Sequence, residues 1–88
     1  MTRLVDSVFG WLLPTAVMTL VEQFGLNVQR LRKAQSLTQE ELSHRCDMKR
    51  SYLSDVERGV RNPTIRALER IAEALGVEPA ILVGKGNH

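Results

Sequence analysis

Apolar residues recur along this chain with the spacing of amphipathic helices. Between residues 5 and 13 they stand at i, i+3, i+4, i+7 and i+8, and similar stripes run over 19–34 and 64–75. Pro14 ends the first stripe and Gly76 follows the third, as helix-terminating residues do. We therefore expect an all-helical chain. The predicted inner faces of the two later helices consist of Leu20, Phe24, Val28, Leu31, Ile65, Leu68, Ile71, Ala72 and Leu75.

Two short helices are predicted between these longer ones, over 38–45 and 50–58. Thr38 and Glu41 have the spacing of a capping box at the start of the first. Asp47 lies in the four-residue turn between them and tolerates a left-handed conformation. Helices this short need longer neighbours to pack on. If they cross steeply, the second projects from the surface, with a size that fits a DNA major groove.

Charge sharpens this picture, although the net charge of the whole chain is only +2. Residues 29–70 hold ten Lys or Arg and six Asp or Glu, which gives this stretch a net charge of +4. Arginine suits phosphate and guanine because its planar fork donates paired hydrogen bonds. A solvated basic face without a partner is the alternative.

Other functional classes find no support in the sequence. Cys46 is the single cysteine, which fits a buried thiol in a reducing cytoplasm. His44 and His88 have no companion metal ligands, and no catalytic motif is present, so we expect neither an enzyme nor a cofactor. The apolar stretch over 4–21 is interrupted by Pro14, and we expect no membrane span.

Three segments together resemble the XRE family, the phage repressor and Cro-like helix-turn-helix proteins. They are Leu-Thr-Gln-Glu-Glu-Leu at 37–42, Arg-Ser-Tyr-Leu-Ser at 50–54 and Val-Glu-Arg-Gly at 56–59. The resemblance implies a five-helix lambda-repressor-like DNA-binding domain, here with an additional N-terminal helix. With its Arg-Ser-Tyr-Leu-Ser and Glu-Arg-Gly stretches and its small size, the chain also resembles restriction-modification controller proteins. The expected organisation is an apolar helical extension at 1–18, a DNA-binding domain at 19–83 with its motif at 38–58, and a flexible tail at 84–88.

The resemblance also assigns structural roles. Gln39 would contact a phosphate and steady the recognition helix, and Ser43 stands where the family prefers a small alanine. Lys49 replaces the usual Ser or Thr cap, which loses a capping bond and places a cation beside the DNA. Arg32 and Glu57 would form a structural ion pair between helices.

The start of the recognition helix is expected to contact bases. Arg50 would pair with a guanine, with a phosphate contact as the alternative. Asp55 could accept from cytosine or hold Arg58, and the loop that follows would track the DNA backbone. The predicted DNA-binding residues are Gln39, Lys49, Arg50, Ser51, Tyr52, Ser54, Asp55, Arg58, Arg61, Asn62 and Thr64.

The expected partners are double-stranded DNA and a second copy of the chain, with no small-molecule ligand. Ile81, Leu82 and Val83, predicted in a short helix over 78–83, are the expected dimer surface, unless they only close the monomer core. The predicted function is a homodimeric transcriptional regulator on an inverted-repeat operator. The alternative is the antitoxin of a toxin–antitoxin pair that uses residues 1–18 to bind its partner. Translation starting at Met18 would instead make residues 1–17 an extension without a role.

Overall fold

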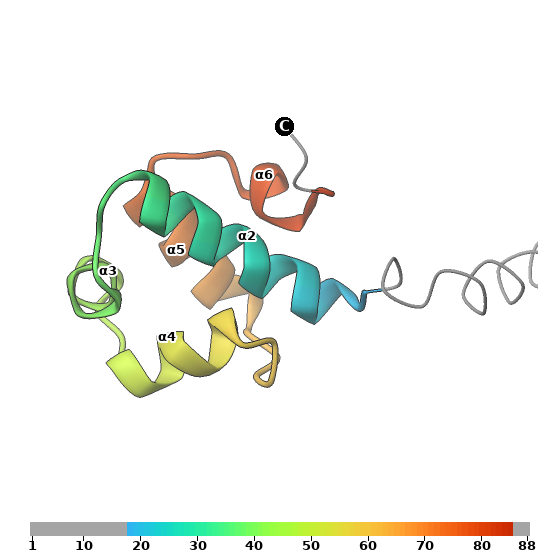
Figure 1. The fold of residues 1–88 in the computed structure, drawn as a ribbon, viewed down its shortest axis with the longest axis horizontal. Coiled ribbons are helices and arrows are strands. Elements are labelled where there is room, and N and C mark those ends of the chain that lie inside the picture. The colour runs from blue at the N-terminus through green and yellow to red at the C-terminus, as the bar shows by residue number, and fades with distance from the viewer. Residues whose placement is uncertain (1–17, 86–88) are drawn as a thin grey trace, which may run out of the picture.

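The computed structural model describes residues 18–85, and within them the chain is all-helical. The described helices are α2 (Leu20–Ala34), α3 (Gln39–Cys46), α4 (Arg50–Glu57), α5 (Ile65–Leu75) and α6 (Pro79–Val83) (Figure 1). These five confirm the predicted helices from 19 onward, with ends shifted by a residue or so. The predicted N-terminal helix over 5–13 and the last residues of the predicted tail lie outside the described part.

Helices α4, α5 and α6 pack against α2, which crosses the middle of the molecule in Figure 1 with α4 below it and α6 above it. The short helices α3 and α4 contact each other, and α3 packs on α5. All five helices contribute to one core, so the two short helices of the motif are held by the longer ones. The core consists of Phe24, Val28, Leu42, Cys46, Leu53, Val56, Ile71, Ala72, Leu75 and Leu82.

Side-chain caps explain where most of the helices begin. Thr38 opens α3 with the capping box that the sequence predicted, through Glu41. Thr19 opens α2 in the same way, through a box that the sequence analysis did not single out. Thr64 caps α5, with its hydroxyl accepting from the backbone N–H of Ala67 at 3.0 Å. Each cap satisfies a backbone donor that the first turn of a helix leaves unpaired.

Three residues predicted on the inner faces or the dimer surface lie elsewhere. Leu20 and Ile65 were expected to be buried, but they are 63% and 74% exposed. Each is the first residue of its helix, where the side chain points back beyond the turns that the neighbouring helices cover. Leu82 was expected on the dimer surface, but it is fully buried in the monomer core. A single-turn helix that docks by one face buries one of three consecutive apolar residues and leaves its neighbours outside.

A buried amide that the sequence analysis did not single out fixes the position of α6. The Nδ2 of Asn27 donates to the backbone oxygens of Leu82 at 2.8 Å and Gly84 at 2.9 Å. Its Oδ1 accepts from Gln23 at 3.2 Å. These bonds tie the last turn of α6 to the middle of α2, and they satisfy carbonyls that a helix end leaves free.

Candidate nucleic-acid interface

The two faces of α4 differ sharply in their surroundings. Leu53 and Val56 are fully buried on one side. Lys49, Arg50 and Ser51 at the start of the helix are exposed to solvent. The helix is therefore anchored along its back and presents its first turn outward. In Figure 1 it forms the lower border of the molecule, with no other described helix beyond it.

Gly25 in α2 lets α4 approach closely. A β-carbon built at Gly25 would lie 2.1 Å from the backbone oxygen of Val56, which is well inside van der Waals contact. The two helices can therefore pack at this distance only with glycine at this position. Gly25 therefore allows the close packing of α4 on α2, although a glycine inside a helix lowers the intrinsic helix propensity.

An ion pair locks the C-terminal end of α4 to α2. The Nε of Arg32 lies 2.6 Å from Oε2 of Glu57, and its Nη2 donates to Oε1 at 2.9 Å. Arg32 also donates to the backbone oxygen of Leu37 at 2.8 Å, and Gln39 donates to Oε1 of Glu57 at 3.0 Å. Both charged groups are buried, and the bidentate geometry with its extra bonds compensates for their lost hydration. The structure thus brings together Arg32, Glu57 and Gln39 from three helices.

At the crossing of α3 and α4 the chain carries a small residue, Ser43. Its side chain is buried, and its hydroxyl donates to the backbone oxygen of Glu40 at 2.8 Å. Asp47, at the C-cap of α3, has φ of 57° and ψ of 50°, which confirms the predicted left-handed turn. Lys49 makes no side-chain capping bond to α4, in agreement with the prediction.

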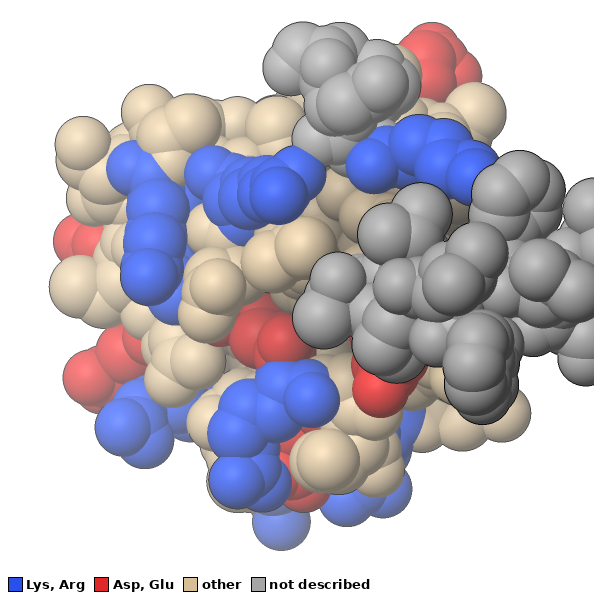
Figure 2. All heavy atoms as spheres, turned by 45° about the vertical axis from the view of Figure 1, so that its right-hand side comes forward, with Lys and Arg blue, Asp and Glu red and all other residues tan. Residues whose placement is uncertain are grey.

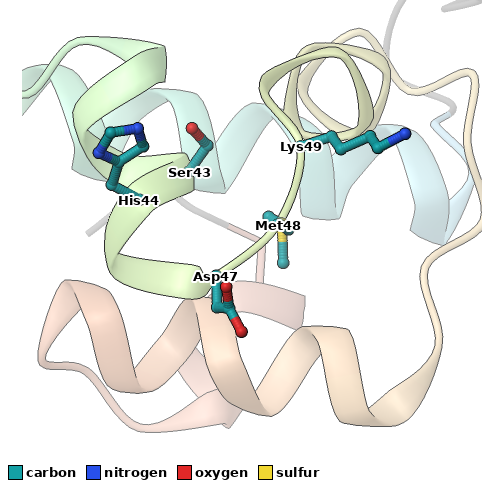
Figure 3. A pocket seen from close by; sticks show the side chains of 5 residues that line it. All are labelled: Ser43, His44, Asp47, Met48 and Lys49. Carbon is teal, nitrogen blue, oxygen red and sulfur yellow. The ribbon is translucent and has the colours of Figure 1, made fainter.

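An open hollow lies outside this crossing, lined by Ser43, His44, Asp47, Met48 and Lys49. Figure 3 shows His44 and Lys49 extending in opposite directions rather than converging on a common point. Among residues 18–85 no group of three or more His, Cys, Asp or Glu is placed to hold a metal ion. The residues that line this hollow therefore border the start of α4, and they do not form a set of metal ligands.

A cluster of charged side chains lies on the second half of α4 and in the loop after it. Asp55 Oδ1 accepts from Nη2 of Arg58 at 2.9 Å, and Asp55 Oδ2 lies 3.5 Å from Nη2 of Arg61. The Arg61 guanidinium also lies over the ring of Tyr52, 5.1 Å from its centre. Four predicted DNA-binding residues are thus joined in one network. Asn62 is exposed in the loop, and it belongs to none of these contacts.

A second, more apolar hollow lies between the start of α4 and α5, and it adds two cations that the sequence analysis did not assign. Its lining includes Lys49, Tyr52, Arg66 and Arg70. Arg66 and Arg70 are four residues apart in α5 and therefore share one helix face, a spacing that could have indicated them. Figure 2 shows basic side chains over both the upper and the lower part of this face, the lower ones at the height where α4 lies in Figure 1.

Titration of two groups is shifted by their surroundings. Burial raises the pKa of the Cys46 thiol to about 11, so that this side chain is neutral near pH 7. The hydrogen bond from the backbone of Thr38 lowers the pKa of Glu41, which favours the charged form that the capping box needs. Cys46 therefore acts as a small apolar core residue, as the sequence predicted.

The two short helices α3 and α4 cross steeply (Figure 1), and they pack on the longer helices α5 and α2 while the first turn of α4 stays exposed. This arrangement defines a helix-turn-helix domain. The family model described as Helix-turn-helix matches residues 28–82. The chain belongs to this family, and its predicted XRE type is confirmed by the relatives it matches.

The chain is similar to restriction-modification controller proteins. It is 44% identical over 61 residues to Control protein C.BamHI of Bacillus amyloliquefaciens, covering 68% of this chain and 75% of that protein. The crystal structure of controller protein C.AhdI from Aeromonas hydrophila matches with a TM-score of 0.68 and 41% identity, over 72% of this chain and 94% of that chain.

A further solved structure shows controller protein C.Esp1396I as a tetramer in complex with its natural 35 base-pair operator. It matches with a TM-score of 0.68 and 30% identity, over 75% of this chain and 87% of that chain. In the described part of the present chain, no helix has the length and apolar character to span a bilayer.

Proposed function

We propose that this chain is a sequence-specific DNA-binding transcriptional regulator whose α4 enters the major groove. The observation that carries the proposal is the placement of α4. Its back is packed on α2 at Gly25 and held by the buried Glu57, while Arg50 and Ser51 are exposed at its first turn. A helix that is fixed behind and free in front can offer side chains to base edges in a defined register.

The surrounding residues suit contacts to the DNA backbone. Lys49 and Arg50 flank the start of α4, and Arg66 and Arg70 extend the basic surface along α5. Phosphate contacts position a protein on the duplex, and base contacts supply its specificity. We assign direct base contact to Arg50, Ser51 and Ser54, and backbone contact to the cations around them.

In-vitro selection of bound duplexes by the full chain tests this function. A shared sequence motif is the expected result, with half-sites about one helical turn apart if two copies bind together. Arg50→Ala should then lose discrimination at one base position of that motif, at a cost of about 1–3 kcal/mol. Arg66→Ala provides the matched control, because the loss of a phosphate contact should lower the affinity for all duplexes alike.

A chain that holds no selected duplex more tightly than random DNA contradicts the proposal. An Arg50→Ala variant that weakens every duplex equally would contradict only the assignment of Arg50 to a base, and it would favour the phosphate contact.

We further propose that the regulator acts as a homodimer through the exposed apolar side chains of α6. Ile81 and Val83 are 40% and 38% exposed and lie on either side of the buried Leu82 in sequence. Exposed apolar side chains on a short helix are compatible with a contact between two copies. Two copies related by a two-fold axis would match an inverted-repeat operator. A role as the controller of a restriction-modification system, like that named for the similar proteins, fits this arrangement.

A further inference from the structure

Asp55 occupies an unusual place on the proposed DNA-binding face, because it is an acid among cations. Its side chain is 30% exposed, and those of Arg58 and Arg61 are 66% and 50% exposed. Each carboxylate oxygen faces a different guanidinium group, Oδ1 toward Arg58 and Oδ2 toward Arg61. One carboxylate therefore engages both arginines, one from the C-cap of α4 and one from the loop that follows.

The spacing in sequence makes this arrangement a property of the helix. Tyr52, Asp55 and Arg58 are three residues apart, so they lie along one stripe of α4. Arg61 lies in the loop three residues after Arg58, and its guanidinium lies 5.1 Å from the centre of the Tyr52 ring. Arg61 is thus held from two sides, by the carboxylate and by the aromatic face.

These contacts compete with binding to DNA. The Nη2 of Arg58 donates to Asp55, and the Nη2 of Arg61 lies 3.5 Å from the same carboxylate, so a phosphate oxygen that takes the place of Asp55 at either arginine must displace the carboxylate. Because the pairs are partly exposed, displacement is possible, but it has a free-energy cost. Both arginines retain other N–H groups, so they can also reach a phosphate that lies in a suitable direction without leaving Asp55.

We infer that Asp55 is a specificity-determining residue that acts through Arg58 and Arg61, by restraining both from the phosphates of unselected duplexes. This inference rests on the proposed function. Non-specific binding depends almost wholly on phosphate contacts, and a protein bound in this way slides along the duplex without a fixed register. In the selected complex the base contacts at the start of α4 fix the register. Arginines released from Asp55 therefore gain less there than on random DNA.

The variant Asp55→Asn tests the inference. Its affinity is measured for the duplex obtained by selection on the wild-type chain and for a scrambled duplex of the same composition. The variant should bind the scrambled duplex about fivefold more tightly, while the selected duplex gains less, so that the ratio of the two affinities falls. Glu69→Gln is the matched control, because it removes an exposed carboxylate on α5 that lies outside the cluster. Melting curves of each variant verify that it is folded.

A double-mutant cycle separates restraint of the arginines from the bare charge of the carboxylate. In a chain that carries Arg58→Gln and Arg61→Gln, the further change Asp55→Asn should leave the affinity for the scrambled duplex unchanged. A gain that persists in that background, an equal gain on both duplexes, or the same gain from Glu69→Gln overturns the inference. Loss of affinity for the selected duplex alone also overturns it, since Asp55 would then contact a base directly. A wild-type chain that does not discriminate between duplexes would instead refute the proposed function.

Discussion

The buried carboxylate of Glu57 makes a prediction about single residues. Glu57→Ala removes the partner of both Arg32 nitrogens and of Gln39, and it leaves the Arg32 cation buried. Breaking a buried pair from one side costs about 3–5 kcal/mol, which is a large part of the stability of a small domain. Urea unfolding should show this loss, while affinity for DNA per folded molecule changes less.

Glu73→Ala is the matched control for Glu57, because Glu73 is an exposed acid on α5. Its effect on the free energy of unfolding should stay within about 0.5 kcal/mol. Equal melting temperatures for Glu57→Ala and the parent chain would contradict a structural role for the pair.

The Cys46 thiol makes stability depend on pH in the alkaline range. Its pKa is raised from 9.0 to about 11 by burial, so the unfolded chain loses this proton before the folded chain does. The contribution is intact below pH 9 and is lost as the pH rises toward 11, at about 1.4 kcal/mol per pH unit. Thermal melts over this range should show a steeper decline for the parent chain than for Cys46→Ala. Parallel declines would show that the thiol ionises equally in both states.

Gly25 illustrates the limit of sequence reasoning at the scale of one residue. Propensity alone marks a glycine inside a helix as a weak point, yet a β-carbon there would overlap the backbone of Val56. The partner lies about thirty residues away in the chain, and only the tertiary fold brings it close. The same holds for Asn27, whose acceptors on α6 are 55 and 57 residues away.

At the scale of elements, substitutions of Lys49 can separate the stability of α4 from its proposed contact with DNA. The N-cap position of α4 lacks a side-chain hydrogen bond because lysine has no acceptor. Lys49→Ser supplies the missing acceptor and should raise the free energy of unfolding by about 1 kcal/mol. It also removes a cation, so the slope of log K against log salt should become shallower by about 0.9.

Lys49→Gln is the matched control, since it removes the same charge with a poor capping residue. It should reproduce the shallower salt slope without the gain in melting temperature. A Lys49→Ser variant with unchanged salt dependence would show that this cation lies away from the duplex.

The helices themselves were largely predictable, and the reasons are local. The capping box at Thr38, the apolar periodicity, and the left-handed turn at Asp47 are set by residues close together in sequence, and the structure reproduces all three. The faces were less predictable at helix ends, where Leu20 and Ile65 continue the apolar stripe but no residue of the part from 18 to 85 covers them. Periodicity gives the direction of a side chain, but the extent of the packed layer decides whether it is buried.

At the scale of the whole molecule, the proposed dimer gives a prediction about assembly. Replacing Ile81 and Val83 together by serine removes apolar surface that the monomer leaves exposed, so the fold should survive. Sedimentation at micromolar concentration should then show a shift from dimer to monomer. Val60→Ser is the matched control, because Val60 is an exposed apolar residue in the loop after α4.

A parent chain that sediments as a monomer at every concentration would contradict the dimer. Dimerisation that survives the double replacement would instead place the contact elsewhere, and would leave the apolar pair without a role in assembly. Leu82→Ser belongs to neither test, since its side chain is part of the core.

The seam between α2 and α6 has a mechanical consequence for such a dimer. Gly25 lets α4, the proposed recognition helix, pack closely on α2, and Asn27, two positions further along α2, holds the end of α6. Any two-fold axis at α6 would therefore be coupled to each α4 directly through α2, with α5 and α3 as a second, longer route. Half-site spacing would then be a built-in dimension of the protein, and a loosened Asn27 clamp should let it tolerate operators whose arms are one base pair too near or too far.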